Sequence, residues 1–340
     1  MNITKYLSMK TVLLLFFIVI PFHVFSQPEK MELASSRLSF TLMEKDTLFG
    51  CTALGVVIPK IKKLFGGISA IECLGENKLM LVSDQYKQDN DKSYFFITDM
   101  NGNILSADPF YGEKNIESVR LNPFFNTYYY SFEKDNSTGV GFITDKKPVN
   151  VFTEKLPSPN RGIEGLTFTK DSALWIAFES GNKTNCDTNG TTTFYKIPYD
   201  KNSGKYDYTL RVSYQYPFNR CSCLDKGKAF NGNLGNGVSE ILALPDDTGK
   251  LLILERCYNG SKPNSVKLYK AQIPATPNQR MEKTLVYDLD KANLEPDNME
   301  GMCWVTLRNG KPALFLISDD NFNHSRQKTL LIKLAVESGK

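Results

Sequence analysis

The sequence is poor in histidine, and this shortage limits the metal sites and catalytic mechanisms open to it. There are two histidines among 340 residues, and His23 lies inside an apolar N-terminal segment. His324 is therefore the one histidine left for chemistry in the remainder of the sequence. Zinc, copper and histidine-rich iron sites are disfavoured for this reason. A Ser-His-Asp hydrolase would need His324 as its base, and no G-x-S-x-G motif accompanies it.

The sequence also lacks a strong charge of either sign. It has 41 Lys and Arg residues against 37 Asp and Glu residues, a formal net charge of +4. No basic run or arginine stripe is present, which argues against nucleic acid as a partner. A small anionic substrate remains compatible with this composition.

Long apolar runs are missing except near the N-terminus. Lys5 and Lys10 precede or border the run TVLLLFFIVI, and VFSQ follows it. This pattern predicts a signal peptide over residues 1–26, cleaved after Ser26. The run is short for a transmembrane helix, so an uncleaved anchor is the weaker alternative. We therefore expect residues 27–340 to form one secreted or periplasmic domain, with no stable membrane insertion after cleavage.

Seven cysteines all follow the predicted cleavage site. In an oxidising compartment they would allow up to three disulfides. We expect at least one disulfide to involve the Cys186–Cys223 region, because a polar loop of this length needs a constraint. Zinc is the alternative, but a C-x-C pair without a second pair or a histidine is a weak signal.

A repeated pattern organises the chain. Each repeat has Gly or Asn, an apolar residue, Ser or Glu, and an apolar run. A polar turn then leads to a second apolar run that ends on an acid. From the starting Gly or Asn to that acid the distances are 17, 18, 17, 18 and 21 residues, and the first starts lie 48 and 47 residues apart. The five segments are GGISAIECLGENKLMLVSD, KNIESVRLNPFFNTYYYSFE, RGIEGLTFTKDSALWIAFE, NGVSEILALPDDTGKLLILE and DNMEGMCWVTLRNGKPALFLISD.

This period predicts an all-β protein, a β-propeller with five recognisable units and five or six mostly four-stranded blades. The motif-bearing strands should be the innermost strands of the blades. Arg37–Met43 should close the ring beside the C-terminal strand TLLIKL. We expect the aromatic run NPFFNTYYYSFE, Trp175 and Trp304 to pack in the core. An irregular β-sandwich is the alternative fold.

The same stretches resemble the phytase-like family described as having esterase-like activity of phytase. The resemblance runs through GGISAIE, NRGIEGLTF and NGVSEILALPDDTGKLLILER, and it is most specific in NMEGM followed by SDDNF and RQKTLLIKL. It implies an exported β-propeller related to calcium-dependent propeller phytases. Two repeats depart from the acidic pattern, since Ser69 stands in the first and Ser239, followed by Glu240, in the fourth.

In a propeller, equivalent positions of all blades converge at one end of the central channel. Clustered acids there must be neutralised by cations or by basic residues. Oxygen ligands without histidine favour Ca²⁺, the cofactor that we predict. The alternative is neutralisation by arginines: Arg120, Arg161, Arg256 and Arg326. The predicted metal ligands are Glu164, Glu179, Glu240, Glu255, Glu300 and Asp319.

These observations lead to two functional hypotheses. The first is an exported, calcium-assisted hydrolase of phosphoesters or related esters. Its catalytic residues would be Glu164, Glu300, Arg161 and Arg256, acting on a small anionic substrate. The second is a non-catalytic propeller that binds a ligand or protein partner, in which the acids are purely structural. Converging acids and arginines favour the first hypothesis, and the absence of a local catalytic motif favours the second.

Overall fold

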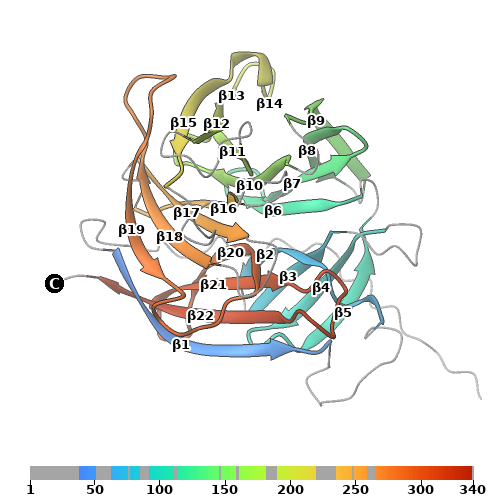
Figure 1. Ribbon diagram of the computed structural model, residues 1–340. Helices are drawn as coiled ribbons and strands as arrows, with labels where there is room; N and C mark the ends of the chain where they lie inside the picture. The colour runs from blue at the N-terminus through green and yellow to red at the C-terminus, as the bar shows by residue number, and fades with distance from the viewer. Residues whose placement is uncertain are drawn as a thin grey trace, which may run out of the picture.

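The described part of the chain consists of β-strands arranged around a central axis (Figure 1). The computed structural model describes residues 38–50, 63–75, 77–84, 92–110, 114–144, 147–157, 161–180, 190–219, 235–246, 249–258 and 265–338. Within these ranges no helix has the length and apolar character that a membrane crossing requires. The predicted signal peptide lies outside the described residues.

Five four-stranded antiparallel sheets form the blades. The first contains β2 (Ile68–Gly75), β3 (Lys78–Ser83), β4 (Tyr94–Asp99) and β5 (Ile104–Pro109). The second contains β6 (Ile116–Asn122), β7 (Thr127–Lys134), β8 (Ser137–Thr144) and β9 (Lys147–Lys155). The third contains β10 (Ile163–Phe168), β11 (Leu174–Phe178), β12 (Thr191–Ile197) and β15 (Val212–Pro217). A small hairpin of β13 (Tyr199–Asp200) and β14 (Lys205–Tyr206) precedes β15.

The fourth blade contains β16 (Gly235–Ala243), β17 (Lys250–Tyr258), β18 (Ser265–Gln272) and β19 (Glu282–Asp288). The fifth contains β20 (Asn298–Thr306), β21 (Pro312–Asp319), β22 (Thr329–Ser338) and the N-terminal β1 (Leu38–Leu48). The chain thus forms a five-bladed β-propeller.

The first strand of each repeat is the innermost strand of its blade, as predicted. Strands β2, β6, β10, β16 and β20 contact one another in a closed circle. Figure 1 shows these strands around the centre, with the other strands of each blade fanning outward. Equivalent positions in the repeats therefore face a common axis, which a sandwich of two sheets would not achieve.

The N-terminal strand closes the ring, which confirms the predicted pairing. In β1, Phe40 lies opposite Val336 and Thr47 lies opposite Leu330 of β22. The strand continues to Leu48, beyond the expected end at Met43, through a bulge between Leu42 and Glu44. Both ends of the described chain are thereby held in the same blade.

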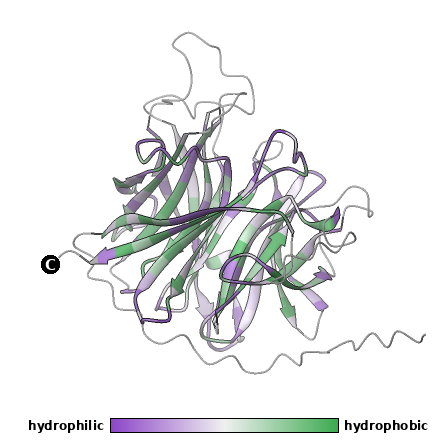
Figure 2. Ribbon diagram, turned by 90° about the horizontal axis from the view of Figure 1, so that it is seen from below, coloured by the Kyte–Doolittle hydropathy of each residue, from purple (hydrophilic) through white to green (hydrophobic). Residues whose placement is uncertain are grey.

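Apolar clusters fill the spaces between neighbouring blades. Trp175 of the third blade packs in one cluster with Ile253 of the fourth, and Phe96 of the first packs with Phe315 of the fifth. Figure 2 shows hydrophobic residues along the strands and hydrophilic ones in many of the connecting turns. Burying one large apolar side chain contributes roughly 1.5–3 kcal/mol, so these clusters are the main force that holds the blades together.

The aromatic run in β7 is largely core, as predicted. Tyr128, Tyr129, Tyr130 and Phe132 are buried, whereas the rings in the 124–125 turn are about 40% exposed. Among the described cysteines, Cys73 and Cys303 carry free thiols. Five cysteines then remain for pairing, so at most two disulfides can form, not three. The predicted disulfide in the Cys186–Cys223 region lies outside the described residues.

Candidate active site

Each inner strand begins with a β-bulge, and the Ser or Glu of the repeat is the bulged residue. In β10, Ile163 pairs with Phe178 and Gly165 pairs with Ala177, which leaves Glu164 unpaired between them. A bulge re-aims the side chain of its extra residue. The repeated Gly–apolar–acid motif therefore specifies a bulge that opens each inner strand. The five bulged residues are Ser69, Glu117, Glu164, Ser239 and Glu300.

The Gly or Asn before each bulge pairs with the end of the second strand. The N–H of Glu133 donates to the Asn115 carbonyl at 3.0 Å, and that of Glu179 donates to the Gly162 carbonyl at 2.9 Å. Asp84 and Asp319 hold the same position in the first and fifth blades. In the fourth blade Gly237 pairs with Arg256 instead. An arginine thus replaces the acid at that one point of the ring.

The glycines at these positions make room for the acid of the preceding blade. A Cβ on Gly162 would lie 2.5 Å from Glu133 Oε1, and one on Gly237 would lie 2.8 Å from Glu179 Oε1. The Gly162 N–H also donates a hydrogen bond to Glu133. Glycine is required where another group approaches the backbone this closely. The motif therefore combines a bulge with a contact between blades.

The bulged acids and the strand-end acids gather at one end of the channel, called the mouth below. Burial raises the pKa of Glu164 well above its usual range, and repulsion from Glu179, Glu133 and Glu300 adds to the effect. Burial likewise raises the pKa of Glu300 to about 8, against the attraction of Arg256. The seven acids at the mouth are Asp84, Glu117, Glu133, Glu164, Glu179, Glu300 and Asp319.

Two arginines face these acids among the described residues. Arg256 Nη1 lies 2.8 Å from Glu300 Oε1, and its Nη2 lies 3.3 Å from Glu179 Oε1. Arg161 Nη1 lies 3.9 Å from Glu179 Oε2. The seven carboxyl groups of the mouth outnumber these two guanidinium groups. Glu300 Oε2 and Ser239 Oγ are buried there without a hydrogen-bond partner.

Glu240 does not join this cluster, contrary to the sequence prediction. It follows the bulge by one residue, and successive side chains of a strand point to opposite faces. Its carboxylate accepts hydrogen bonds from Ser118 Oγ at 3.0 Å and from the Leu166 N–H at 3.1 Å. Arg120 Nη2 lies 2.7 Å from Glu240 Oε2. Burial raises the pKa of Glu240 to about 7 although Arg120 favours its ionised form.

Arg120 and Glu240 belong to a second, deeper set of charges. Arg120 also pairs with Glu72 and donates to the carbonyl oxygens of Leu166 at 3.1 Å and Met302 at 3.2 Å. It lies three residues beyond the bulge of β6, roughly 10 Å along the strand. Together with the pair between Arg120 and Glu240, these contacts join all five inner strands. We call Glu72, Arg120 and Glu240 the inner triad.

Glu255 also lies elsewhere, so its predicted place in the metal site is wrong. It accepts a hydrogen bond from Tyr216 Oη at 2.6 Å and an ion pair from Lys283. These partners come from the outer strands of the third and fourth blades. Of the six predicted ligands, the structure brings together Glu164, Glu179, Glu300 and Asp319. The acids that the predicted set omitted are Asp84, Glu117 and Glu133, all of which occupy repeat positions.

The mouth has the donor chemistry of a calcium site without a preformed cage. Carboxylate oxygens are the ligands that Ca²⁺ prefers. Within the described residues, however, no three His, Cys, Asp or Glu side chains stand close enough together to hold a metal ion. Glu300 Oε2 is the carboxylate oxygen of this cluster that is buried without a hydrogen-bond partner, as are Ser239 Oγ and Arg256 Nε. The mouth therefore matches a hard cation in its carboxylate donor atoms and its excess of negative charge, but not in the arrangement of those atoms.

The SDDNF segment shapes the edge of the mouth. Asp320 accepts hydrogen bonds from the N–H groups of Gly67 at 2.9 Å and Phe322 at 3.0 Å, and it contacts His324 Nδ1 at 2.7 Å. Asn321 and Phe322 have φ angles of 50° and 52°, in the sparsely populated left-handed region. The two aspartates hold this turn by accepting its backbone N–H groups. His324 is thus a loop residue bonded to Asp320.

The fold and the mouth define a class: a five-bladed β-propeller with a buried acidic cluster at one end of its channel. The chain belongs to the phytase-like family described as "Esterase-like activity of phytase", whose model matches residues 63–322. No curated protein matches the chain.

Solved structures with a similar fold include two that cover most of the chain. One is the PQQ-bound form of aldose sugar dehydrogenase from Streptomyces coelicolor, with 11% identity, a TM-score of 0.45, and coverage of 88% of this chain and 99% of that chain. Another is endo-arabinase from Bacteroides thetaiotaomicron, with 10% identity, a TM-score of 0.48, and coverage of 82% and 96%. Likeness at this level carries no argument about this chain.

Proposed function

We propose that the protein is an exported, calcium-assisted hydrolase of phosphoesters or related esters, with its active site at the acidic mouth. The observation that carries this proposal is the surplus of buried carboxyl groups, together with the unpartnered Glu300 Oε2. Buried acids without counter-charges must take up protons or bind a cation. Export follows from the predicted signal peptide and would place the protein where calcium is abundant.

Glu300, Asp319 and Glu179 would hold the ion, and their side chains would have to move closer together to do so. Their oxygens surround the one arginine of the strand-end positions, Arg256, and repel one another. When bound, the ion would polarise the phosphoryl or carbonyl oxygen of the substrate as a Lewis acid. Glu164 lies in the same electrostatic field and belongs to the predicted metal set.

The chain itself supplies anion binding and a base. Arg161 and Arg256 present guanidinium groups, which match the geometry of phosphate and carboxylate oxygens. No hydrogen bond or ion pair engages the Glu164 carboxylate within the described residues. We assign Glu164 the role of the group that takes a proton from the attacking water, because it lies among the mouth acids beside the residues that would hold the ion.

A non-catalytic propeller is the second candidate. It is favoured by the ion pairs of Arg256 with Glu300 and Glu179, which already neutralise part of the cluster. In this case the mouth would bind an anionic ligand or partner without turnover.

Turnover of a panel of phosphomonoesters, phosphodiesters and carboxylesters, with and without calcium, separates the two candidates. The hydrolase should show calcium-dependent turnover of at least one ester class. Glu164→Gln should abolish it, while Glu255→Gln, a buried acid outside the mouth, should retain it. If none of the three ester classes is turned over at saturating calcium, the hydrolase is rejected and the non-catalytic propeller is the candidate that remains.

Calcium binding is measured separately from activity. A ligand that binds only the folded state raises stability by about 2.7 kcal/mol at a hundred times its Kd. We expect calcium to raise the melting temperature of the wild type and of Glu255→Gln, and to lose this effect in Glu300→Gln. An unchanged melting curve of the fully chelated wild type on adding calcium would exclude the metal.

A further inference from the structure

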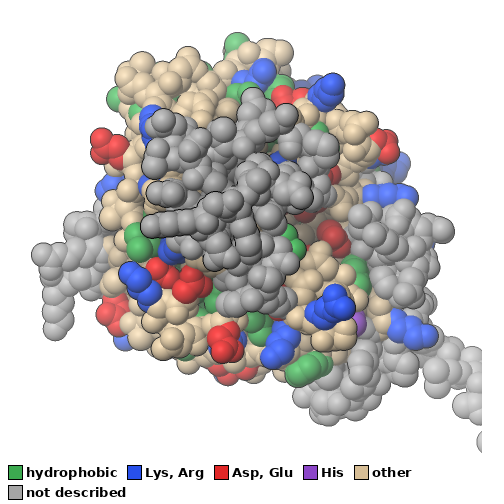
Figure 3. All heavy atoms as spheres, in the orientation of Figure 1, with side chains coloured by type: hydrophobic (Ala, Val, Ile, Leu, Met, Phe, Trp, Pro, Cys, Tyr) green, Lys and Arg blue, Asp and Glu red, His purple; other side chains and the backbone are tan. Residues whose placement is uncertain are grey.

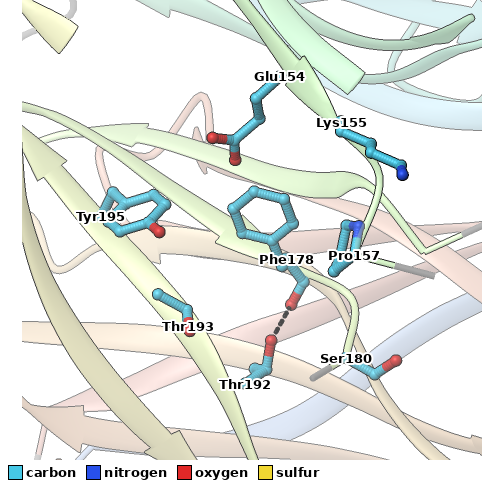
Figure 4. Close-up of a pocket in the computed structure, with 8 residues that line it drawn as sticks. All are labelled: Glu154, Lys155, Pro157, Phe178, Ser180, Thr192, Thr193 and Tyr195. Atoms are coloured by element: carbon cyan, nitrogen blue, oxygen red, sulfur yellow. Dashed lines mark hydrogen bonds between the residues drawn. The ribbon is translucent and has the colours of Figure 1, made fainter. Parts of the chain in front are cut away.

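A cavity lies between the second and third blades, beside the mouth. Its volume is about 170 Å³. Figure 4 shows the Phe178 ring between Tyr195 and Pro157, with Thr192, Thr193 and Ser180 on one side and Glu154 and Lys155 on the other. The cavity is thus bounded by the outer strand of one blade and by the second and third strands of the next.

Arg161 connects this cavity to the mouth. Its Nη1 donates a hydrogen bond to Ser180, which lines the cavity, and lies 3.9 Å from Glu179 Oε2 in the mouth. Ser180 directly follows Glu179 in the chain, so their Cα atoms are about 3.8 Å apart. A ligand in the cavity could therefore place an attached anionic group on Arg161.

The lining combines an apolar surface with available hydroxyl groups. The Phe178 ring is buried, and the Tyr195 ring stands nearly perpendicular to it at 87°, with 5.9 Å between ring centroids. The Thr192 hydroxyl is already used, because it donates to the Phe178 carbonyl at 2.8 Å. The Tyr195 hydroxyl has no hydrogen bond within the described residues and points into the cavity (Figure 4). A purely apolar ligand would leave such a group desolvated and unpaired.

The charges of the lining favour a neutral ligand group. Glu154 and Lys155 are neighbours of opposite sign, so they set up no net charge at the cavity. Glu154 Oε2 already accepts a hydrogen bond from Tyr208 Oη. The group that fits therefore has an apolar face for Phe178, hydroxyls for Tyr195 and Thr193, and no charge of its own.

The volume suits one ring. A cavity of about 150 Å³ accommodates benzene, so 170 Å³ has room for a single six-membered ring. A monosaccharide unit has this size, with C–H groups on its faces and hydroxyls on its edge.

We propose that this cavity is the leaving-group subsite of the enzyme and binds a single sugar ring whose ester group is held by Arg161. The inference rests on the proposed hydrolase function and names its substrate class as sugar phosphates. In the reaction, the bond between phosphorus and the sugar oxygen breaks. Water supplies the new oxygen on phosphorus and the proton that the departing sugar oxygen takes up.

The test compares two phosphate monoesters, glucose 1-phosphate and the acyclic glycerol 3-phosphate. Tyr195→Phe removes one hydrogen bond, which should lower kcat/KM for glucose 1-phosphate about tenfold. Tyr195→Ala should lower it about a hundredfold, mainly through KM. Both variants should keep glycerol 3-phosphate turnover within about twofold. Tyr287→Phe, a half-buried tyrosine of the fourth blade, is the matched control and should leave both substrates unchanged.

A binding measurement distinguishes failure of this inference from failure of the proposed function. Methyl glucoside carries no phosphate, and its binding is observed by ligand-detected NMR. It should bind to wild type and Glu164→Gln and lose binding in folded Tyr195→Ala. If methyl glucoside binds but no ester is turned over, the sugar site is retained and the hydrolase function is rejected. Turnover with equal effects of Tyr195→Ala on both phosphates, or absence of methyl glucoside binding, would overturn the inference.

Discussion

The acidic mouth should make the metal-free protein less stable as the pH rises from about 5 to about 8. Burial raises the pKa of Glu300 to about 8 and that of Asp319 to about 7. Repulsion from neighbouring acids adds to both shifts, and the attraction of Arg256 opposes them. In the unfolded chain both carboxyls ionise near pH 4. Between these values the folded state binds more protons than the unfolded state, so the free energy of unfolding falls with increasing pH.

The size of this loss follows from the shift at Glu300. Raising its pKa from 4.5 to about 8 corresponds to an upper limit of about 5 kcal/mol, since one pKa unit is worth about 1.4 kcal/mol. Coupled acids share their protons, so a net loss of roughly 3 kcal/mol is expected. This is a large part of a typical stability of about 5–15 kcal/mol. For about 300 residues the entropy of unfolding is roughly 0.6 kcal/mol/K, so this loss should lower the melting temperature by about 5 °C.

Thermal unfolding at pH 5, 6, 7 and 8, first with a chelator and then with calcium, measures the effect. Calcium should restore most of the loss at pH 8 and little at pH 5, where protons already neutralise the acids. Glu300→Gln should flatten the pH dependence in chelator, because it removes a buried carboxyl whose pKa is raised to about 8. Stability that stays level or increases between pH 5 and 8 in chelator would refute the reasoning.

Three further predictions concern the architecture. Arg120→Met should cost about 3–5 kcal/mol in urea unfolding, because it leaves buried acids unpaired. The double variant with Glu240→Leu should recover part of that loss, and a cost below about 1 kcal/mol would contradict the inner triad. Gly162→Ala should lower the free energy of unfolding by about 1–3 kcal/mol, because its Cβ would lie 2.5 Å from Glu133 Oε1. An unchanged free energy of unfolding would show that the second and third blades can move apart at this contact without cost. Thiol titration of the unfolded, unreduced protein should find five or fewer free thiols if the Cys186–Cys223 region is bridged, whereas seven would disprove the bridge.

The sequence alone determined the repeat and hence the blades. Five segments share one spacing from Gly or Asn to a terminal acid, and this regularity predicted five inner hairpins around one axis. The N-terminal segment Arg37–Met43, which belongs to no repeat, predicted the ring closure. These features depend on local patterns of apolar and turn residues, which each repeat carries in full.

Only the tertiary structure decided which acids meet. In the fourth repeat the letters VSE and LER admit two alignments, and the sequence comparison aligned Glu240 and Glu255 with the acids of the other blades. The bulge shows that Ser239 and Arg256 hold those positions. A shift of one residue moves a side chain to the other face of its strand. Ser239 and Arg256 therefore face the mouth, whereas Glu240 belongs to the inner triad and Glu255 pairs with Lys283.

The counter-charges were equally hidden in the sequence. Arg120 bonds to a glutamate 48 residues before it and to a carbonyl oxygen 182 residues after it, and nothing in its local sequence indicates either partner. The same holds for the cavity beside Arg161, which is formed by strands of two blades. A local pattern fixes where a strand begins and where it bulges, but the neighbours of a side chain on the axis are set by the closure of all five blades.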